Sequence, residues 1–355
     1  MGSKVTVLTT VYNGMPYLRE AIESTLNQTY AEFEYLIIDD GSTDDSVKCI
    51  KSYNDSRIRF VQNEKNLGTS DTINKGLSLI KTPYVVRLDQ DDISLPNRIH
   101  EQIEYLDNHP EISIVCSWEH IIDSDGKIIR DCRASINNYG DFLGPILLGL
   151  CPIWHPSITF RKDDMVMVGG FDTSFTRAED FEVTAKYALE RLHAAIVPKF
   201  HLLQRKHFNS QSALYDDRQA SVARRVHVKV LNFFNANSFT EELGYFLRLE
   251  KELTGKKMTK EYLQTISNEL ENLLSSIEVK QKLTPVELKS LKKIIYKRAG
   301  LGILFLKNFS FLPAPLFKLF FYTLSPLQIP SVRGFVSKIY YKIMRIPYLI
   351  KSVKN

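Results

Sequence analysis

Short apolar runs that each end in a polar cluster recur along the first ninety residues. The runs at 5–10, 35–38 and 58–62, and a fourth that starts at Tyr84, are rich in β-branched residues, and segments with helical spacing separate them. Strands that alternate with helices at this pace predict a parallel, doubly wound α/β sheet. In such sheets, ligands bind beyond the carboxyl ends of the strands. We therefore expect the polar clusters to form the functional site.

Further along the chain, strands and helices still mix up to about residue 212. The segment 121–129 has Asp-Gly at its centre, which is typical of a tight hairpin turn, and two separate strands are expected at 195–197 and 202–205. From residue 214 onward the apolar spacing is helical. We expect three parts: an α/β domain at 1–212, a helical accessory region at 213–290, and a basic, apolar helical tail at 291–355.

The tail differs from the rest of the chain in charge. Twelve of the 46 Lys and Arg residues and none of the 41 Asp and Glu residues lie at 291–355, so the remainder is net negative. The segment 332–349 alternates basic with apolar residues, as in a helix that lies on a membrane surface. A helical subdomain that packs on the body, with its basic residues solvated, is the alternative. The many aliphatic residues of the tail favour lipid over nucleic acid as its partner.

The cellular location is predicted from three features: the length of the apolar runs, the first residues, and the spacing of the cysteines. No uncharged run reaches the ~20 residues that a membrane-spanning helix needs. The first residues run directly into a strand without a signal peptide, and the four cysteines show no Cys-x-x-Cys spacing. We expect a cytoplasmic protein that is peripheral on the inner face of the cell membrane.

Three carboxylates, Asp89, Asp91 and Asp92, follow the fourth apolar run. Like charges at this spacing repel one another and favour a counter-charge. Mg²⁺ or Mn²⁺, which takes carboxylates together with the phosphate oxygens of a substrate, would supply it. The alternative is that the acidic residues cap a helix that starts near Pro96.

Seven motifs in order resemble a family 2 glycosyltransferase with a GT-A fold, a doubly wound and mostly parallel sheet made of a nucleotide-binding half and an acceptor half. The resemblance covers about residues 4–212. The motifs are Val-Leu-Thr-Thr-Val-Tyr-Asn (7–13), Ile-Ile-Asp-Asp-Gly-Ser-Thr-Asp (37–44), Asn-Leu-Gly (66–68), Leu-Asp-Gln-Asp-Asp (88–92), His-Pro-Ser (155–157), Gly-Gly-Phe-Asp (169–172) and Ala-Glu-Asp (178–180).

The resemblance implies a slot for the base of a nucleotide. Asp40 would accept a hydrogen bond from the imide of uracil, and Thr10 and Tyr12 would line the same slot. Lys65 and Asn66 would supplement it, unless they are a solvated lysine and a turn asparagine.

The resemblance also implies a metal site on the diphosphate of the nucleotide. Asp91 would be a metal ligand, with Asp92 as a second or alternative ligand, and Asp89 would reach the ribose or the metal's waters. His207 would contact the metal or the phosphates; the alternative is a structural histidine.

The resemblance places the chemistry itself on a second group of residues. Asp180 matches the general base of the family, and Glu179 would orient the acceptor or support the site. The alternative for both is a favourable charge at a helix N-terminus. Trp154 and His155 fall in the stretch that lines the acceptor or the donor sugar in the family; a core tryptophan is the alternative for Trp154.

The implied activity is inverting transfer of a hexose or N-acetylhexosamine from a nucleotide sugar, expected to be a UDP-sugar, to a saccharide or lipid-linked acceptor of a surface glycan such as lipopolysaccharide or capsule. Transfer would be non-processive, because the Gln-x-x-Arg-Trp motif of processive synthases is absent. A dinucleotide-binding fold is disfavoured because no Gly-x-Gly-x-x-Gly follows the first strand. A degenerate transferase domain that binds a membrane or a glycan remains the alternative.

Overall fold

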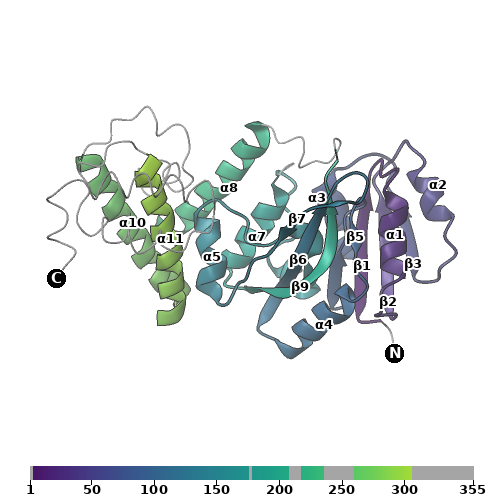
Figure 1. Ribbon diagram of the computed structural model, residues 1–355, viewed down its shortest axis with the longest axis horizontal. Coiled ribbons are helices and arrows are strands. Elements are labelled where there is room, and N and C mark those ends of the chain that lie inside the picture. The colour runs from purple at the N-terminus through teal and green to yellow at the C-terminus, as the bar shows by residue number, and fades with distance from the viewer. Residues whose placement is uncertain (1–2, 176–177, 208–216, 236–259, 306–355) are drawn as a thin grey trace.

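The structure is a computed structural model that describes residues 3–175, 178–207, 217–235 and 260–305. A nine-stranded mixed sheet crosses the molecule in the order β3-β2-β1-β4-β8-β6-β9-β5, and β7 lies beside β6 (Figure 1). The strands are β1 (Val5–Val11), β2 (Phe33–Asp39), β3 (Ile58–Gln62), β4 (Tyr84–Arg87), β5 (Ile93–Ser94), β6 (Ile112–Ile122), β7 (Ile128–Cys132), β8 (Thr159–Arg161) and β9 (His193–Arg205).

Helices cover both faces of this sheet, and each face has its own apolar core. The first face packs against α1 (Leu18–Leu26), α2 (Ser46–Lys51) and α4 (Arg98–Asn108). The second packs against α3 (Thr69–Leu79), α5 (Tyr139–Leu147), α6 (Lys162–Met167) and α7 (Glu179–Leu189). Its core continues outward into α8 (Asp217–Asn235), which packs on α5 and α7, and into α10 (Lys260–Gln281) and α11 (Pro285–Phe305), which pack on α8 and α5, respectively. A short 3-10 helix, η1 (His155–Ser157), lies between α5 and β8.

The N-terminal half confirms the predicted parallel arrangement. β1 pairs in parallel with β2 on one side and with β4 on the other, and β2 pairs in parallel with β3. These strands are continuous apolar runs because both faces of the sheet are covered. The chain therefore leaves β1, β2 and β4 at one edge of the sheet, where the polar clusters follow.

The second half corrects one prediction. The two strands expected at 195–197 and 202–205 are a single 13-residue strand, β9, which pairs in parallel with β6. The register between them shifts beside Trp118, opposite the stretch of β9 that contains Pro198. Proline lacks an N–H group, so the ladder is interrupted there without ending the strand.

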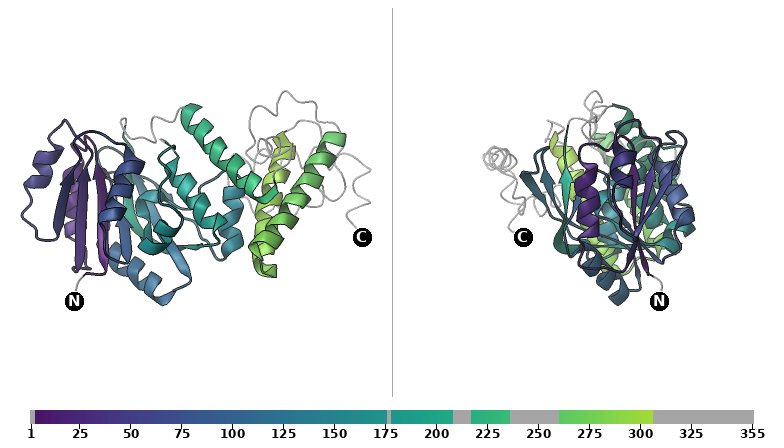
Figure 2. Two further views of the ribbon diagram at one scale, coloured as in Figure 1. Left: turned by 180° about the vertical axis from the view of Figure 1, so that it is seen from behind. Right: turned by 90° about the vertical axis from the view of Figure 1, so that its right-hand side faces the viewer.

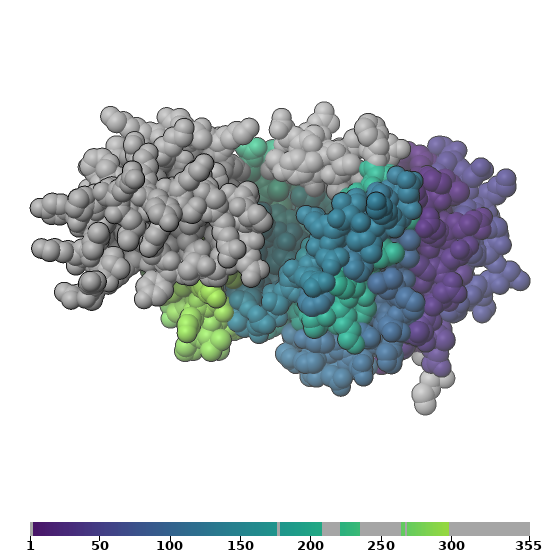
Figure 3. Space-filling model, viewed as in Figure 1, coloured from purple at the N-terminus to yellow at the C-terminus, as the bar shows by residue number. Residues whose placement is uncertain are grey.

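The C-terminal helices extend the molecule away from the nucleotide-binding half. α10 and α11 lie at the end opposite to β2 and β3 in Figure 1 and in the left view of Figure 2. The space-filling view also shows the yellow-green and purple parts of the chain at separate ends (Figure 3). α11 packs on α5, where Gly140 and Gly144 leave room for it. No helix among the described residues has the length and apolar composition that would let it cross a bilayer. Most of the predicted tail, from residue 306, lies outside the described residues.

Candidate active site

The predicted polar clusters meet at one edge of the sheet. Val11 at the end of β1 is level with Asp39 at the end of β2, and Arg87 at the end of β4 is level with Leu8 of β1. The loop after β1 joins the loop after β4 through Tyr12, whose backbone N–H donates to Oε1 of Gln90 (2.8 Å). The carboxyl ends of three parallel strands thus enclose the site.

The acidic run after β4 is folded so that its three carboxylates have different partners. Asp89 accepts a hydrogen bond from Nη2 of Arg87 (2.6 Å) and keeps 37% of its side chain exposed. Oδ2 of Asp91 lies 2.9 Å from Nε2 of His207. Asp92 is buried, and its Oδ1 accepts from the backbone N–H of Arg205 (2.8 Å).

These contacts give the carboxylates of Asp91 and Asp92 an unfavourable electrostatic environment. Burial raises the pKa of both, well above the usual value for Asp92, and the charges of the neighbouring aspartates raise it further. His207 opposes the pKa rise at Asp91. A divalent cation would relieve this repulsion, and carboxylate and imidazole are suitable ligands for Mg²⁺ or Mn²⁺. The donor set therefore fits such an ion, although no three His, Cys, Asp or Glu side chains are gathered into a metal site within the described residues.

Arg205 attaches the end of β9 to the acidic run, and the sequence reasoning did not single it out. Its Nε donates to the backbone carbonyl of Asp91 (3.1 Å), and its Nη2 donates to Glu20 on α1 (2.9 Å). The guanidinium group also lies over the ring of Tyr17, 4.5 Å from its centroid. These contacts bring His207, two residues later, to Asp91.

The predicted nucleotide slot is built around Asp40, which is only 4% exposed. Its Oδ1 accepts from Nδ2 of Asn63 (2.8 Å) and from the backbone N–H of Leu67 (2.9 Å). Its Oδ2 accepts from the backbone N–H of Gly68 (2.9 Å). Asp40 therefore holds the loop that follows β3 against the end of β2.

The remaining slot residues lie at the rim. Lys65 and Asn66 are exposed on this loop, and their backbone passes so close to Gly41 that a Cβ there would lie 2.7 Å from the carbonyl carbon of Lys65. Tyr12 is 45% exposed, and Thr10 is half-buried near the end of β1. The structure thus brings the residues of the predicted nucleotide slot together at the edge of the sheet where the acidic run also lies.

Glu179 and Asp180 begin α7 after an unusual backbone conformation. Ala178 is left-handed (φ 59°, ψ 27°), which costs a residue with a Cβ about 1 kcal/mol or more. The turn directs the chain so that Asp180 lies in the first turn of the helix and accepts from the backbone N–H of Phe181 (2.7 Å). Burial raises the pKa of Glu179 to about 7, and the charges of Asp180 and Asp89 add to the effect.

His155 lies on η1, which is held beside the end of β4 because Arg98 donates to the backbone carbonyls of both Arg87 and Pro156. Burial and the charge of Arg87 lower the pKa of His155 to about 4, while the charges of Asp180 and Asp89 act in the opposite direction. The imidazole is therefore neutral at pH 7, and its ring meets Phe171 edge to face (5.4 Å). Its Nε2 is buried without a hydrogen-bond partner among the described residues.

Trp154, which was predicted to line the acceptor or the sugar, is half-buried. Its side chain packs against the apolar core on the face of the sheet covered by α5 and α7.

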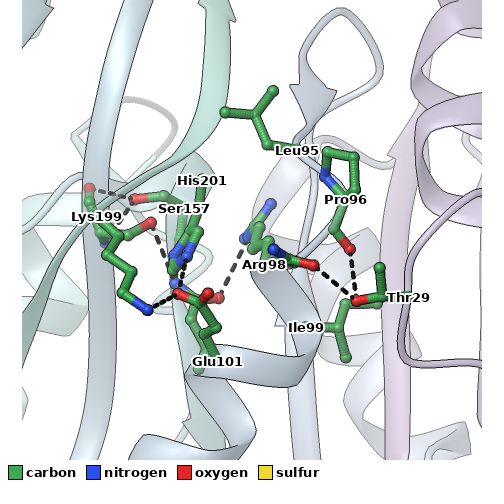
Figure 4. A network of polar contacts seen from close by, with 12 residues as sticks. Thr29, Leu95, Pro96, Arg98, Ile99, Glu101, Ser157, Lys199 and His201 are labelled. Atoms are coloured by element: carbon green, nitrogen blue, oxygen red, sulfur yellow. Dashed lines mark hydrogen bonds and ion pairs between the residues drawn. The ribbon is translucent and has the colours of Figure 1, made fainter.

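Two buried arginines support this region, and neither was expected from the sequence. Arg87 is 2% exposed at the end of β4. Arg98, on α4, is fully buried and donates from Nη2 to the backbone carbonyls of Arg87 and Pro156 (3.1 Å to the latter). One turn along α4, Glu101 binds His201 on β9 (2.8 Å; Figure 4). A charged residue inside an apolar strand was the signal for Arg87, but the pattern does not say what the charge contacts.

Comparisons with known proteins assign this part of the chain to a family. The sequence model described as Glycosyl transferase family 2 matches residues 6–178. An uncharacterized glycosyltransferase of Methanocaldococcus jannaschii is 29% identical over 205 residues, which is 57% of this chain and 70% of the relative. Another, from Rickettsia prowazekii, is 29% identical over 286 residues, which is 78% of this chain and 79% of the relative.

A solved structure has the same fold. The crystal structure of S. aureus TarS in complex with UDP-GlcNAc matches with a TM-score of 0.55 at 16% identity, covering 83% of this chain and 86% of that one. The mixed sheet, the helices around it and the helical C-terminal region are those of the GT-A fold. Over residues 6–178 the chain belongs to glycosyl transferase family 2, and the protein is a glycosyltransferase.

Proposed function

We propose that the protein transfers one hexose or N-acetylhexosamine per encounter from a nucleoside-diphosphate sugar to a saccharide or lipid-linked saccharide, with inversion at the anomeric carbon. The observation that carries the proposal is that the acidic run after β4 and the polar loops after β1 and β2 meet at one edge of the sheet, with Oδ2 of Asp91 2.9 Å from Nε2 of His207. The charges of Asp89, on the nucleotide side, and of Asp180, on α7, both act on the pKa of His155, which supports a base near the diphosphate site. That arrangement supports a one-step displacement.

Asp180 is the proposed general base. The acceptor hydroxyl must lose its proton as it attacks the anomeric carbon, and a carboxylate within hydrogen-bond reach can take it. The side chain of Asp180 is half-buried in the first turn of α7 and therefore remains accessible to an acceptor. Glu179 is half-buried beside it and would orient the acceptor or support the site.

The diphosphate would bind at the acidic run. A Mn²⁺ or Mg²⁺ ion held by Asp91, with Asp92 and His207 as further ligands, would stabilise the negative charge that develops on the leaving phosphate. The hydrogen bond from Arg205 to Asp92 fixes the turn that presents Asp91. Asp89 would contact the ribose or the waters of the ion.

The base of the nucleotide would bind between Tyr12 and the loop that carries Lys65 and Asn66. Asp40 has one hydrogen bond on Oδ2, so that oxygen keeps a lone pair for the imide N–H of uracil. Thr10 would line the slot from β1. The presence of UDP-GlcNAc in the TarS structure supports uridine diphosphate as the nucleotide.

The acceptor and the location follow from the charge of the chain. The basic, apolar tail supports binding to the cytoplasmic face of a membrane, where a lipid-linked acceptor of a surface glycan such as lipopolysaccharide or capsule is presented.

Calorimetry with UDP, dTDP, GDP and CMP, with and without Mn²⁺, tests the proposal on the wild type and on Asp91→Ala. Metal-dependent binding of UDP that is lost in Asp91→Ala is the expected result, and Asp125→Ala in the exposed hairpin turn is the matched control. If the folded wild type binds none of the nucleotides under any condition, the enzymatic proposal fails. A transferase domain that serves only to bind a membrane or a glycan would then be the better explanation.

A further inference from the structure

The side chain of Arg87 is a buried cation with unused hydrogen-bond donors. It is 2% exposed, and one of its nitrogens, Nη2, binds Asp89 (2.6 Å). Its Nε and Nη1 are buried with no hydrogen-bond partner among the described residues. A buried donor without an acceptor destabilises the fold, and more so when it is charged. Such a cost is tolerated where a ligand supplies the missing acceptor.

Two other polar groups converge on the same place from different elements. Nε2 of His155, on η1, is also buried without a partner. Glu179, at the start of α7, brings a half-buried carboxyl group. Nη2 of Arg98 donates to the backbone carbonyls of both Arg87 and Pro156, which joins the end of β4 to η1. The charge of Arg87 also acts on the pKa values of His155 and Glu179. The backbone N–H of Arg87 donates to the carbonyl of Ile158 (3.0 Å), which holds the end of β4 beside η1.

The three groups are also connected to the two ends of the proposed reaction. Arg87 binds Asp89, beside the diphosphate site, and Glu179 directly precedes Asp180, the proposed base, at the start of α7. In a direct displacement the transferred sugar must lie between the leaving phosphate and the acceptor hydroxyl. Residues that link these two ends are therefore the candidates to contact the donor sugar.

We propose that Arg87, His155 and Glu179 form the subsite that hydrogen-bonds the hydroxyl groups of the transferred sugar, with Arg87 as its main donor. This inference rests on the proposed function, and it assigns the donor sugar to residues of β4, η1 and α7. Arg87 would recognise sugar oxygens through Nε and Nη1 while Nη2 holds Asp89.

The chemistry of the cluster favours a neutral, hydroxylated ring over an anion. Asp89 already balances the charge of Arg87, and Glu179 would repel a carboxylate or a phosphate. A hydroxyl group both donates and accepts, so it can satisfy the guanidinium, the neutral imidazole and the carboxyl group together. A site built to hydrogen-bond substrate hydroxyls discriminates strongly against analogues that lack them, because its polar groups are then left unpaired.

The test compares the affinity for UDP with the affinity for UDP-glucose, UDP-galactose and UDP-N-acetylglucosamine, by calorimetry with Mn²⁺. The variants are Arg87→Met and Arg87→Lys, with Arg19→Met, at an exposed site on α1, as the control for the chemical change. If the wild type prefers guanine, GDP and GDP-mannose take the place of the uridine compounds. Binding of UDP shows that the variant is folded and that its nucleotide site is intact. The difference in affinity between UDP and the UDP-sugar measures the contribution of the sugar subsite.

We expect Arg87→Met to weaken binding of the best UDP-sugar by roughly 10- to 100-fold, the loss typical of a hydrogen bond to a charged group, and to change UDP binding by less than about threefold. Arg87→Lys should retain UDP binding and still lose most of the affinity for the sugar, because lysine keeps the charge but not the planar fork. Arg19→Met should change neither.

Three results would overturn the inference alone: equal loss of UDP and UDP-sugar binding in Arg87→Met, no loss of either, or full recovery by Arg87→Lys. Each would mean that Arg87 acts only through Asp89 or not at all. Should Arg87→Met fail to fold, His155→Asn takes its place in the same comparison, and unchanged UDP-sugar affinity would then be the contrary result. A wild type that binds no nucleoside diphosphate would overturn both the inference and the proposed function.

Discussion

Asp180 is the residue on which the proposed chemistry depends, because it is the carboxylate that α7 presents to the site. Replacing it with asparagine keeps the shape and removes the ability to accept a proton. We expect Asp180→Asn to lower kcat by about 10²- to 10⁴-fold, the usual contribution of a general base, while the affinity for the nucleotide is maintained. Transfer assays and nucleotide calorimetry on the same preparation measure the two effects.

The matched control for this change is Asp163→Asn, at an exposed position on α6. Its activity should equal that of the wild type. Retention of kcat in Asp180→Asn would show that another group takes the proton.

Glu119 makes the stability of the fold depend on pH. It is 1% exposed on β6, its Oε2 has no hydrogen-bond partner among the described residues, and burial raises its pKa from 4.5 to about 7. A raised carboxyl pKa gives stability that is fully present below about pH 4.5 and is lost as the pH rises through about 7. Glutamine cannot ionise and does not incur this loss.

We therefore expect the free energy of unfolding of Glu119→Gln, relative to the wild type, to increase by about 2 kcal/mol between pH 5 and pH 8. Urea denaturation at both pH values measures the difference. Glu111→Gln, at an exposed position just before β6, should show no such trend. A constant difference for Glu119→Gln would contradict a raised pKa.

Sequence motifs identified individual carboxylates better than their partners. Asp89, Asp91 and Asp92 were readable because like charges cluster at the end of an apolar run. The partner of Asp92 is the backbone of Arg205, which is 113 residues away. No local periodicity encodes a contact at that separation, and the same holds for the hydrogen bond from Arg98 to the backbone carbonyl of Pro156, which is 58 residues away.

At the scale of elements, the close contact of α5 with α11 depends on two glycines. A Cβ on Gly140 would overlap the carbonyl oxygen of Glu287, which is backbone and cannot move aside alone. A Cβ on Gly144 would lie 2.8 Å from Cδ1 of Ile294, which is the end of a flexible side chain. We expect Gly140→Ala to destabilise the protein by about 1–3 kcal/mol and Gly144→Ala to cost less.

Urea denaturation gives the loss of stability, and hydrogen exchange of α11 shows whether the helix has separated from α5. Faster exchange confined to α11 and its neighbours in Gly140→Ala is the expected pattern. Equal stability of the two alanine variants would show that α11 adjusts its position at no cost.

The predicted elements differ in how much the local pattern says about them. β1 and β3 were predicted closely because they are short, apolar and bounded by turns. β9 was predicted as two strands because the polar stretch around Pro198 interrupts its pattern, whereas pairing with β6 holds it together. β5 has only two residues, and it exists because β9 pairs with it.

The whole molecule combines an acidic body with a basic tail, and this predicts binding to anionic membranes. Neutralising Arg333, Lys338, Lys342 and Arg345 to glutamine in the full chain should weaken binding to vesicles that contain phosphatidylserine by roughly 100-fold or more at low salt. The estimate follows from about 1 kcal/mol per basic residue near such a surface. Vesicle sedimentation measures it, and vesicles of phosphatidylcholine alone are the control.

If the wild type does not sediment with anionic vesicles, the tail does not bind this kind of membrane. The alternative, in which 332–349 belongs to a helical subdomain that packs on the body, is then favoured. The fold class was predictable at this scale because strand and helix periods alternate from the start of the chain. The position of α11 was not, since it depends on two small residues of α5 and not on any repeat of its own.

The attachment of Arg205 to the acidic run has a consequence for how the enzyme folds during its synthesis on the ribosome. Translation delivers β1 to β4 early, yet the strand that pairs with β5 and binds Asp92 emerges more than a hundred residues later. A nascent chain that stops before β9 can complete the first parallel strands but leaves the carboxylates of the acidic run after β4 unanchored. Sites that are closed by late, non-local pairing form slowly. The proposed nucleotide site of the newly made protein should therefore form only after the last strand of the sheet has left the exit tunnel.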